Sequence, residues 1–266
     1  SFLTSDHFQE CGFNTNCTLS KIISLDNSNI ILVGYMSENN NVDIGNLWMF
    51  ELNSNLEFSG RYNIDQNQIS KANDIIEDQD NIIVVGSYLN ENNNKDVLIN
   101  KYNKYGNTFE LVWTKSWDYS SIDNEGKGII NGTDYYFIVV NSNENINILK
   151  LDKSGNYEPE LLFEINNAYA NDIIQISDGY ALVGYKIMNN SYKNVYIAKF
   201  NNNGIEWDQN YGCDGDDIGY DIKETFEGGM GLGGFIIGAT IENYDDFDAW
   251  LIKTNHLGMT NEIICD

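Results

Sequence analysis

The chain repeats one pattern of short strands five times, and this repeat limits its fold more than any other feature. The clearest copy contains the pair Ile173-Ile174, the apolar run Tyr180 to Gly184, the segment Val195 to Phe200 and a turn that ends at Gly204. The other copies begin near Lys21, Asn73, Lys127 and Tyr220. A period of roughly 45–55 residues is typical of propellers and solenoids.

Each copy predicts four strands and no helix. Short apolar runs bounded by turn residues indicate strands. Polar turns that end in glycine, such as Asp152 to Gly155 and Asn255 to Gly258, indicate hairpins. Four antiparallel strands repeated radially are the blades of a propeller. We therefore predict an all-β fold, a five-bladed β-propeller of four-stranded antiparallel blades.

The predicted propeller forms a single domain over residues 1–266. Its blades cover approximately 19–63, 64–118, 119–164, 165–211 and 212–266. Residues 1–18 are left over and are predicted to close the ring beside the last blade. A glycine late in the second strand predicts one crowded backbone position that recurs in each blade. It stands at Gly34, Gly86, Gly184 and Gly238, and Val140 replaces it in the middle copy.

The charge of the chain limits its partners. Its 15 basic and 40 acidic residues give a net charge of −25. Such a surface repels nucleic acid, which requires clustered Lys and Arg, and it also repels anionic lipid surfaces. No apolar run reaches about 18 residues, so no membrane insertion is predicted. A protein or a glycan remains as partner, as does a homo- or hetero-assembly on the cell surface.

The four cysteines predict disulfides. Cys11, Cys17, Cys213 and Cys265 form no C-x-x-C pair, which argues against a zinc site. Two disulfides imply an oxidising compartment, and a first residue Ser1 is what removal of a signal peptide leaves. We therefore expect an extracellular or cell-surface protein. Three pairings are open, and one hypothesis joins Cys265 to Cys11 or Cys17 as a staple between the two ends.

Two acidic loops in the last copy are candidate calcium ligands, because Ca²⁺ accepts six to eight oxygen ligands in flexible arrangements. They are Asp214, Asp216 and Asp217, and Asp245, Asp246 and Asp248. The alternative is a pair of solvated loops, since no EF-hand pattern is present. No other cofactor is predicted. In a propeller these loops share a face with the connections between blades, and this face is the predicted binding surface.

Other motifs give little support for catalysis. Gly229 to Gly234 fits G-x-G-x-x-G, but it falls between two predicted strands rather than before a helix. His7 and His256 have no nucleophile motif nearby. We therefore predict no catalytic residue. Five tryptophans would suit sugar stacking if they faced solvent, but four occupy equivalent strand positions and are expected to pack between blades.

The last copy resembles the repeat of secreted bacterial and archaeal β-propeller proteins, the SBBP or delta-60-like class. The resemblance covers about residues 19–266 and is poorer in the third copy. It is carried by Trp207, Tyr211-Gly212, Asp217, Asp221-Ile222, Gly234 to Gly238, Asp248 to Lys253 and Gly258. The resemblance implies a surface or extracellular location and no shared catalytic residues.

The predicted function is that of a non-catalytic extracellular binding module that recognises a protein or glycan through the acidic loop face. The first alternative is a structural subunit of an extracellular assembly. The second is a carbohydrate-active enzyme that uses a carboxylate pair, because glycoside hydrolysis needs two carboxyl groups at about 5–9 Å.

Overall fold

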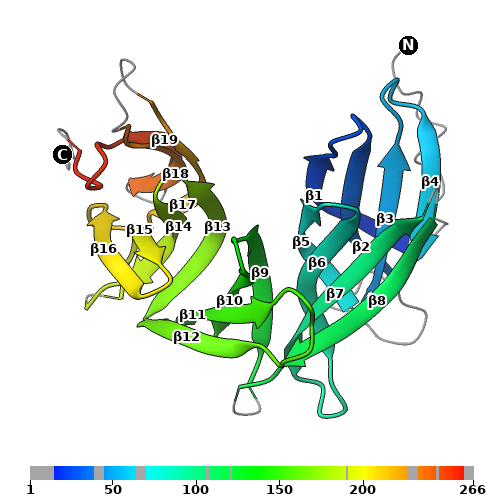
Figure 1. Cartoon of the computed structure of the whole chain (residues 1–266). Helices are drawn as coiled ribbons and strands as arrows, with labels where there is room; N and C mark the ends of the chain where they lie inside the picture. The colour runs from blue at the N-terminus through cyan, green and yellow to red at the C-terminus, as the bar shows by residue number, and fades with distance from the viewer. Residues whose placement is uncertain are drawn as a thin grey trace. The chain divides into compact units, whose positions relative to one another are not determined.

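The computed structural model describes residues 15–38, 45–63, 70–105, 108–119, 122–189, 191–226, 233–243 and 246–260. These residues form five antiparallel sheets in chain order, each built from strands that pair with their neighbours in sequence (Figure 1). The predicted all-β, five-bladed propeller fold is confirmed.

The blades match the predicted repeats closely. The first contains β1 (Thr15–Ser24), β2 (Ile30–Glu38), β3 (Asn46–Leu52) and β4 (Phe58–Asn63). The second contains β5 (Ser70–Asp78), β6 (Asn81–Leu89), β7 (Lys95–Tyr105) and β8 (Thr108–Trp117). The third contains β9 (Asn124–Asn131), β10 (Tyr135–Ser142), β11 (Asn145–Asp152) and β12 (Glu160–Asn166).

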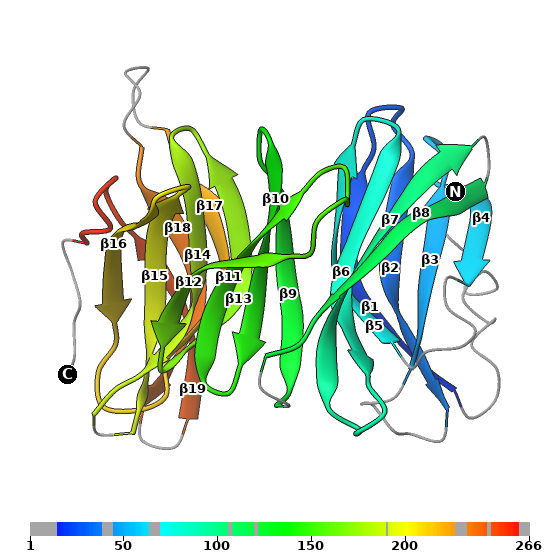
Figure 2. The same cartoon turned by 60° about the horizontal axis from the view of Figure 1, so that its bottom comes forward.

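The fourth blade contains β13 (Ala168–Ile176), β14 (Gly179–Ile187), β15 (Lys193–Asn201) and β16 (Gly204–Tyr211), which run side by side (Figure 2). The fifth contains β17 (Ile218–Glu224), β18 (Phe235–Asn243) and β19 (Asp246–Lys253). The fourth strand predicted at Ile263-Ile264 lies outside the described residues. At the other end, β1 begins at Thr15, inside the segment that was expected to close the ring.

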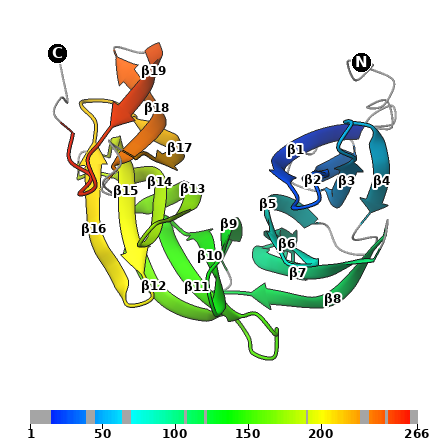
Figure 3. The ribbon, with the colours of Figure 1, turned by 45° about the horizontal axis from the view of Figure 1, so that its top comes forward.

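The chain divides into two compact units, which are described separately. The first comprises residues 1–138 and 151–159, and the second comprises residues 139–150 and 160–266. In the first unit, apolar side chains of blades one and two form one core, with Ile31, Met49 and Ile82 almost fully buried. In the second unit, β17 lies against β13 and β14 (Figure 3). Val183, Ile197 and Ile237 are fully buried in the core there.

The recurrent glycine lies where two strands of one blade approach most closely. A Cβ atom on Gly86 would lie 1.8 Å from the carbonyl oxygen of Lys71, and one on Gly184 would lie 1.8 Å from that of Tyr169. Gly34 is equally crowded, at 1.9 Å from the oxygen of Thr18. Each contact lies beside a bulge in the first strand. The predicted crowding is thus confirmed at three copies but is wrong at Gly238, where an added Cβ atom would have no described atom within 4 Å. The pairing register explains the difference, because Ala239 rather than Gly238 pairs beside the bulge of the fifth blade, as Gly184 does in the fourth.

An Asn-Asp pair in the first strand ties one blade to the next in both units. In the second unit, Asn171 Nδ2 donates to the Gly219 carbonyl at 2.8 Å, and Asp172 Oδ2 accepts the Ile222 amide at 3.3 Å. In the first unit, Asn73 Nδ2 donates to a carbonyl at 2.8 Å and Asp74 Oδ2 accepts an amide at 2.9 Å from the third blade. These side chains thus bond to backbone groups in the first strand of the next blade.

Candidate functional site

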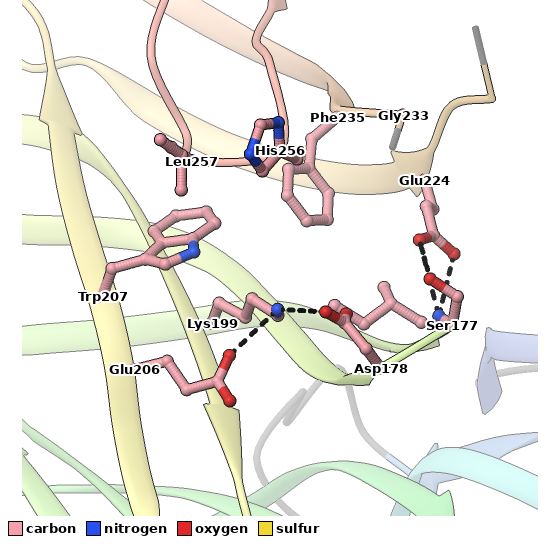
Figure 4. A pocket seen from close by; sticks show the side chains of 11 residues that line it. Ser177, Asp178, Lys199, Glu206, Trp207, Glu224, Gly233, Phe235, His256 and Leu257 are labelled. Carbon is pink, nitrogen blue, oxygen red and sulfur yellow. Dashed lines mark hydrogen bonds and ion pairs between the residues drawn. The ribbon is translucent and has the colours of Figure 1, made fainter. Parts of the chain in front are cut away.

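A small pocket opens in the second unit, between the fourth and fifth blades (Figure 4). Its volume is about 180 Å³, below the 300–1,000 Å³ typical of sites for drug-sized ligands. The pocket therefore suits one small unit, such as a single sugar ring. Its polar side chains are Ser177, Asp178, Lys199, Glu206, Glu224 and His256.

The pocket is built from hairpin tips at one end of the two blades. Ser177 and Asp178 form the turn between β13 and β14, and Glu224 is the last residue of β17. The turn that carries His256 follows β19. Asn255 stabilises it, because its Oδ1 accepts the amides of Leu257 and Met259 at 2.9 Å each.

Lys199 organises the charges of the pocket. Its Nζ lies 2.7 Å from Asp178 Oδ2 and 2.9 Å from Glu206 Oε2, and the residue is only 9% exposed (Figure 4). Burial lowers the pKa of Lys199, but the hydrogen bonds and charges of both carboxylates outweigh it, so the pKa is raised. Two oxygens at 2.7 Å and 2.9 Å from one nitrogen are no more than 5.6 Å apart. Lys199 thus holds the two carboxyl groups close together.

A third carboxylate lies on the fifth-blade side of the pocket. Glu224 accepts the Ser177 amide at 3.1 Å and the Ser177 hydroxyl at 2.9 Å (Figure 4). Both donors are neutral, so Glu224 keeps its negative charge without the neutralisation that Lys199 gives the other two. Carboxylate oxygens such as these accept hydrogen bonds from hydroxyl groups.

One wall of the pocket is apolar. Trp207 meets Phe235 edge to face, with ring centroids 5.8 Å apart. The indole also packs on Gly258, where a Cβ atom would lie 2.6 Å from the ring, and the φ of 73° at this turn favours glycine. An aromatic wall that faces carboxylates suits a ligand with apolar C–H faces and hydroxyl edges.

The repeat shows why this pocket exists. In the first unit, Lys101 occupies the place of Lys199, but its Nζ donates to the Tyr136 hydroxyl at 3.1 Å and to the Lys153 carbonyl at 3.2 Å. Tyr136 in turn donates to Asp78 at 2.6 Å. These groups satisfy one another between the second and third blades.

The fourth and fifth blades differ from this arrangement at three positions. Phe235 takes the place of Tyr136. Each ring packs against a tryptophan of the preceding blade, with ring centroids 5.8 Å apart for Phe235 and Trp207 and 6.5 Å apart for Tyr136 and Trp113. Ile176 stands at the place of Asp78, and His256 at that of Lys153. Without the hydroxyl and its carboxylate acceptor, the lysine bonds instead to Asp178 and Glu206 in its own blade.

The predicted acidic loop of Asp214, Asp216 and Asp217 is engaged in local structure. Asp217 is fully buried and accepts the amides of Cys213 at 2.9 Å and Glu242 at 3.0 Å. Burial raises its pKa, and the nearby charges of Asp216 and Glu242 add to this effect. Asp216 pairs with Lys193 at 2.7 Å, whereas Asp214 is exposed.

The second predicted loop is described in part. Asp246 and Asp248 are exposed on β19, and Asp245 lies outside the described residues. Within the described part of the chain, no group of three or more His, Cys, Asp or Glu side chains is arranged to hold a metal ion. The calcium site therefore stays a prediction, and the described aspartates bond to nearby backbone amides: Asp216 and Asp217 hold the loop, and Asp246 accepts the Phe247 amide at 2.9 Å.

Replacing the buried Asp217 with Ala is expected to destabilise the protein by about 2–4 kcal/mol, because it leaves two partly buried amides without an acceptor. Urea unfolding followed by circular dichroism measures the change. Asp214→Ala is the matched control in the same loop, and its effect should stay within about 0.5 kcal/mol because the side chain is exposed. Equal effects of the two variants would contradict the buried structural role of Asp217.

The other predicted features are placed as follows. Cys17 and Cys213 are disulfide-bonded, whereas Cys11, Cys265 and His7 lie outside the described residues, so the pairing stays a prediction. The glycine run lies between the antiparallel strands β17 and β18, which do not offer the helix that a dinucleotide site needs. Trp48 is buried, and Trp113 and Trp207 pack against aromatic side chains of the next blade.

The pocket lies at the hairpin end of the strands, away from the acidic loops that the sequence pointed to. Its residues come from turns between first and second strands and between third and fourth strands. One signal in the sequence could have indicated this pocket. The fifth copy departs from the repeat at Phe235, where the third copy has Tyr136.

No protein-family model and no curated protein matches the sequence. Solved structures with the same fold do match. One is an exo-β-1,3-galactanase from Phanerochaete chrysosporium with galactose, with a TM-score of 0.51 and 12% identity over 85% of this chain and 60% of that one. Another is a Trypanosoma rangeli sialidase, with a TM-score of 0.52 and 6% identity over 90% of this chain and 54% of that one. The chain thus spans little more than half the length of these structures.

These similarities correct the predicted function. The sequence was interpreted as a non-catalytic binding module, in part because the repeat resembles a class without shared catalytic residues. The galactanase and the sialidase share the fold and are glycosidases. This finding contradicts the prediction that the protein is not an enzyme. Separately, the described residues contain no helix that is long and apolar enough to cross a membrane.

Proposed function

We propose that the protein is a carbohydrate-active enzyme that binds a sugar unit in the pocket between the fourth and fifth blades and cleaves its glycosidic bond. One observation carries the proposal. Asp178 and Glu206, no more than 5.6 Å apart, lie beside the aromatic wall of Trp207 and Phe235. Retaining glycosidases use two carboxyl groups about 5–5.5 Å apart, a separation that lies within this upper limit.

In this mechanism, one carboxylate attacks the anomeric carbon while the other carboxyl group protonates the leaving oxygen. The second group then takes a proton from the water that releases the sugar. Lys199 bonds to both groups and so holds them beside the same pocket. The group that protonates the leaving oxygen must carry a proton when the sugar is bound, and the group that attacks must be a carboxylate.

The apolar wall supplies binding energy and orientation. The indole of Trp207 offers a flat surface to the C–H face of a sugar, and the carboxylates receive the hydroxyl groups at its edge. We propose extracellular glycans as the substrates. The disulfide-bonded cysteines Cys17 and Cys213 favour an oxidising compartment, which supports this location.

Substituting Phe235 by Tyr tests the pocket directly. The new hydroxyl should reach Lys199 as the Tyr136 hydroxyl reaches Lys101, and it should fill the space for the sugar. We expect KM for a cleaved aryl glycoside to rise at least about tenfold, because a bound sugar unit loses its place. The measurement uses a panel of chromogenic aryl glycosides that includes β-galactosides and sialosides.

Tyr136→Phe is the matched control, since it removes a hydroxyl at the equivalent place in the first unit and leaves the pocket unchanged. Its KM should equal that of the original protein. Trp207→Ala, with Trp113→Ala as its own control, checks the result independently. Absence of hydrolysis across the panel, together with no sugar binding by calorimetry, would refute the proposed function.

A further inference from the structure

We infer that the pocket selects a positively charged amino sugar, with a glucosamine unit as the simplest example, and rejects sugars that carry a carboxylate. This inference rests on the proposed function and names its substrate class. It follows from the charges around the pocket and from how Lys199 is paired.

The pocket carries more negative than positive charge. Asp178, Glu206 and Glu224 contribute three carboxylates, and Lys199 contributes one ammonium. His256 also lines the pocket, so the excess is two negative charges when its imidazole is neutral and one when it is protonated, in a space of about 180 Å³. The net charge of −25 on the whole chain adds to the same field. A cation is therefore attracted to the pocket, and an anion is repelled from it.

The lysine offers little to an anionic ligand. Its Nζ already pairs with two carboxylates at 2.7 Å and 2.9 Å, and the residue is 9% exposed. A sugar carboxylate would have to displace one of these partners and would then face the carboxylate it had displaced. Like charges at such short range are strongly unfavourable.

Glu224 is the natural acceptor for a ligand ammonium. Its donors in the described part of the chain are the amide and hydroxyl of Ser177, which carry no charge. An ammonium at this position makes a charge-assisted hydrogen bond, which is stronger than the bond that a hydroxyl would make. Trp207 also lines the pocket, and a cation near an indole face gains a further attraction.

Isothermal titration calorimetry with defined sugars tests this inference. The probes are a β-linked glucosamine disaccharide, the same disaccharide with both amines acetylated, and a glucuronic acid disaccharide. Titrations at about pH 6 keep the carboxylates ionised and the amines protonated. The glucosamine disaccharide should bind about tenfold more tightly than the acetylated one, the effect of one charged hydrogen bond. The glucuronic acid disaccharide should bind more weakly than both.

Glu224→Gln should reduce the preference for glucosamine to about threefold or less, because it removes the charge and keeps the shape. The matched control is Glu125→Gln, which makes the same change in the first unit and should retain the preference. Tetralysine is a fourth probe: binding as tight as that of the glucosamine disaccharide would mean that charge alone is recognised and would overturn the assignment to an amino sugar.

The outcomes also separate this inference from the proposed function. If the acetylated disaccharide binds as tightly as glucosamine, the charge selection is overturned and sugar binding by the pocket stands. If none of these disaccharides binds but an aryl glycoside of the panel is hydrolysed, the inference fails and the proposed function stands. If there is neither binding nor hydrolysis, both fail. Salt gives a further readout, because raising it should weaken glucosamine binding and leave binding of the acetylated form almost unchanged.

Discussion

Glu206→Gln is expected to lower kcat by about 10²–10⁴-fold on any glycoside that the protein cleaves, the range for loss of a catalytic proton-transfer group. The amide keeps the size and shape of the side chain but can neither attack as a carboxylate nor carry the exchanged proton. KM should change much less than kcat, because Trp207, Phe235 and Glu224 still bind the sugar. Asp178→Asn is expected to show a loss of similar size.

The measurement is a comparison of kcat and KM with one chromogenic glycoside. Glu110→Gln provides the matched control, because it makes the same change at an exposed position on β8, in another blade. The variant should stay folded, since Lys199 keeps its bond to Asp178 at 2.7 Å and an ion pair of this kind contributes about 1 kcal/mol or less. An unchanged kcat in Glu206→Gln and Asp178→Asn would show that this carboxylate pair does not act on the bond.

Gly184→Ala is expected to destabilise the protein by at least about 3 kcal/mol, a loss at the upper end for an overpacked core site. The added methyl group would lie 1.8 Å from the Tyr169 carbonyl oxygen, a backbone atom that no side-chain rotation can move. To relieve the clash, β13 and β14 would have to separate and give up hydrogen bonds in the middle of the fourth blade. The pocket should be lost with the blade, because β13 ends beside it.

Urea unfolding, followed by circular dichroism, measures this loss. The control is Gly238→Ala in the second strand of the fifth blade, one residue before the position equivalent to Gly184, where the added methyl group would have no described atom within 4 Å. This variant should be within about 0.5 kcal/mol of the original protein. If the two variants were equally stable, the close approach would not be the reason for glycine at this place.

The fold could be predicted from the sequence because its signals are local. Apolar runs such as Ile82 to Val85 and turns such as Asn255 to Gly258 report strands and hairpins within a few residues. Five copies of the same pattern then support one assignment of strands. The order of the strands follows because the connections between them are short. Crowding at Gly34, Gly86 and Gly184 was also readable, because a glycine inside a strand often marks a bulge or a close approach of two backbones.

The candidate site could not be predicted in the same way. Asp178 and Glu206 lie 28 residues apart in the sequence and come together only through Lys199, which pairs with both. Nothing in either local segment marks it as part of a pocket. The conspicuous acidic loop, by contrast, satisfies its own backbone through Asp217. A short sequence pattern shows that acidic residues are clustered, but it does not show which groups they bond to. The hydrogen-bond partners depend on which distant segments of the chain meet in the fold.

The amino-acid sequence alone predicted the five blades and the antiparallel order of their strands. It did so because strand, turn and glycine preferences act over a few residues and recur at a constant period. Only the tertiary structure decided that the carboxylates of the acidic loop bond to backbone amides and that a pocket opens at the other end of the strands. The pocket depends on contacts between two blades. Trp207 of the fourth blade packs on Phe235 of the fifth, and Phe235 lacks the hydroxyl that Tyr136 offers to Lys101 in the first unit.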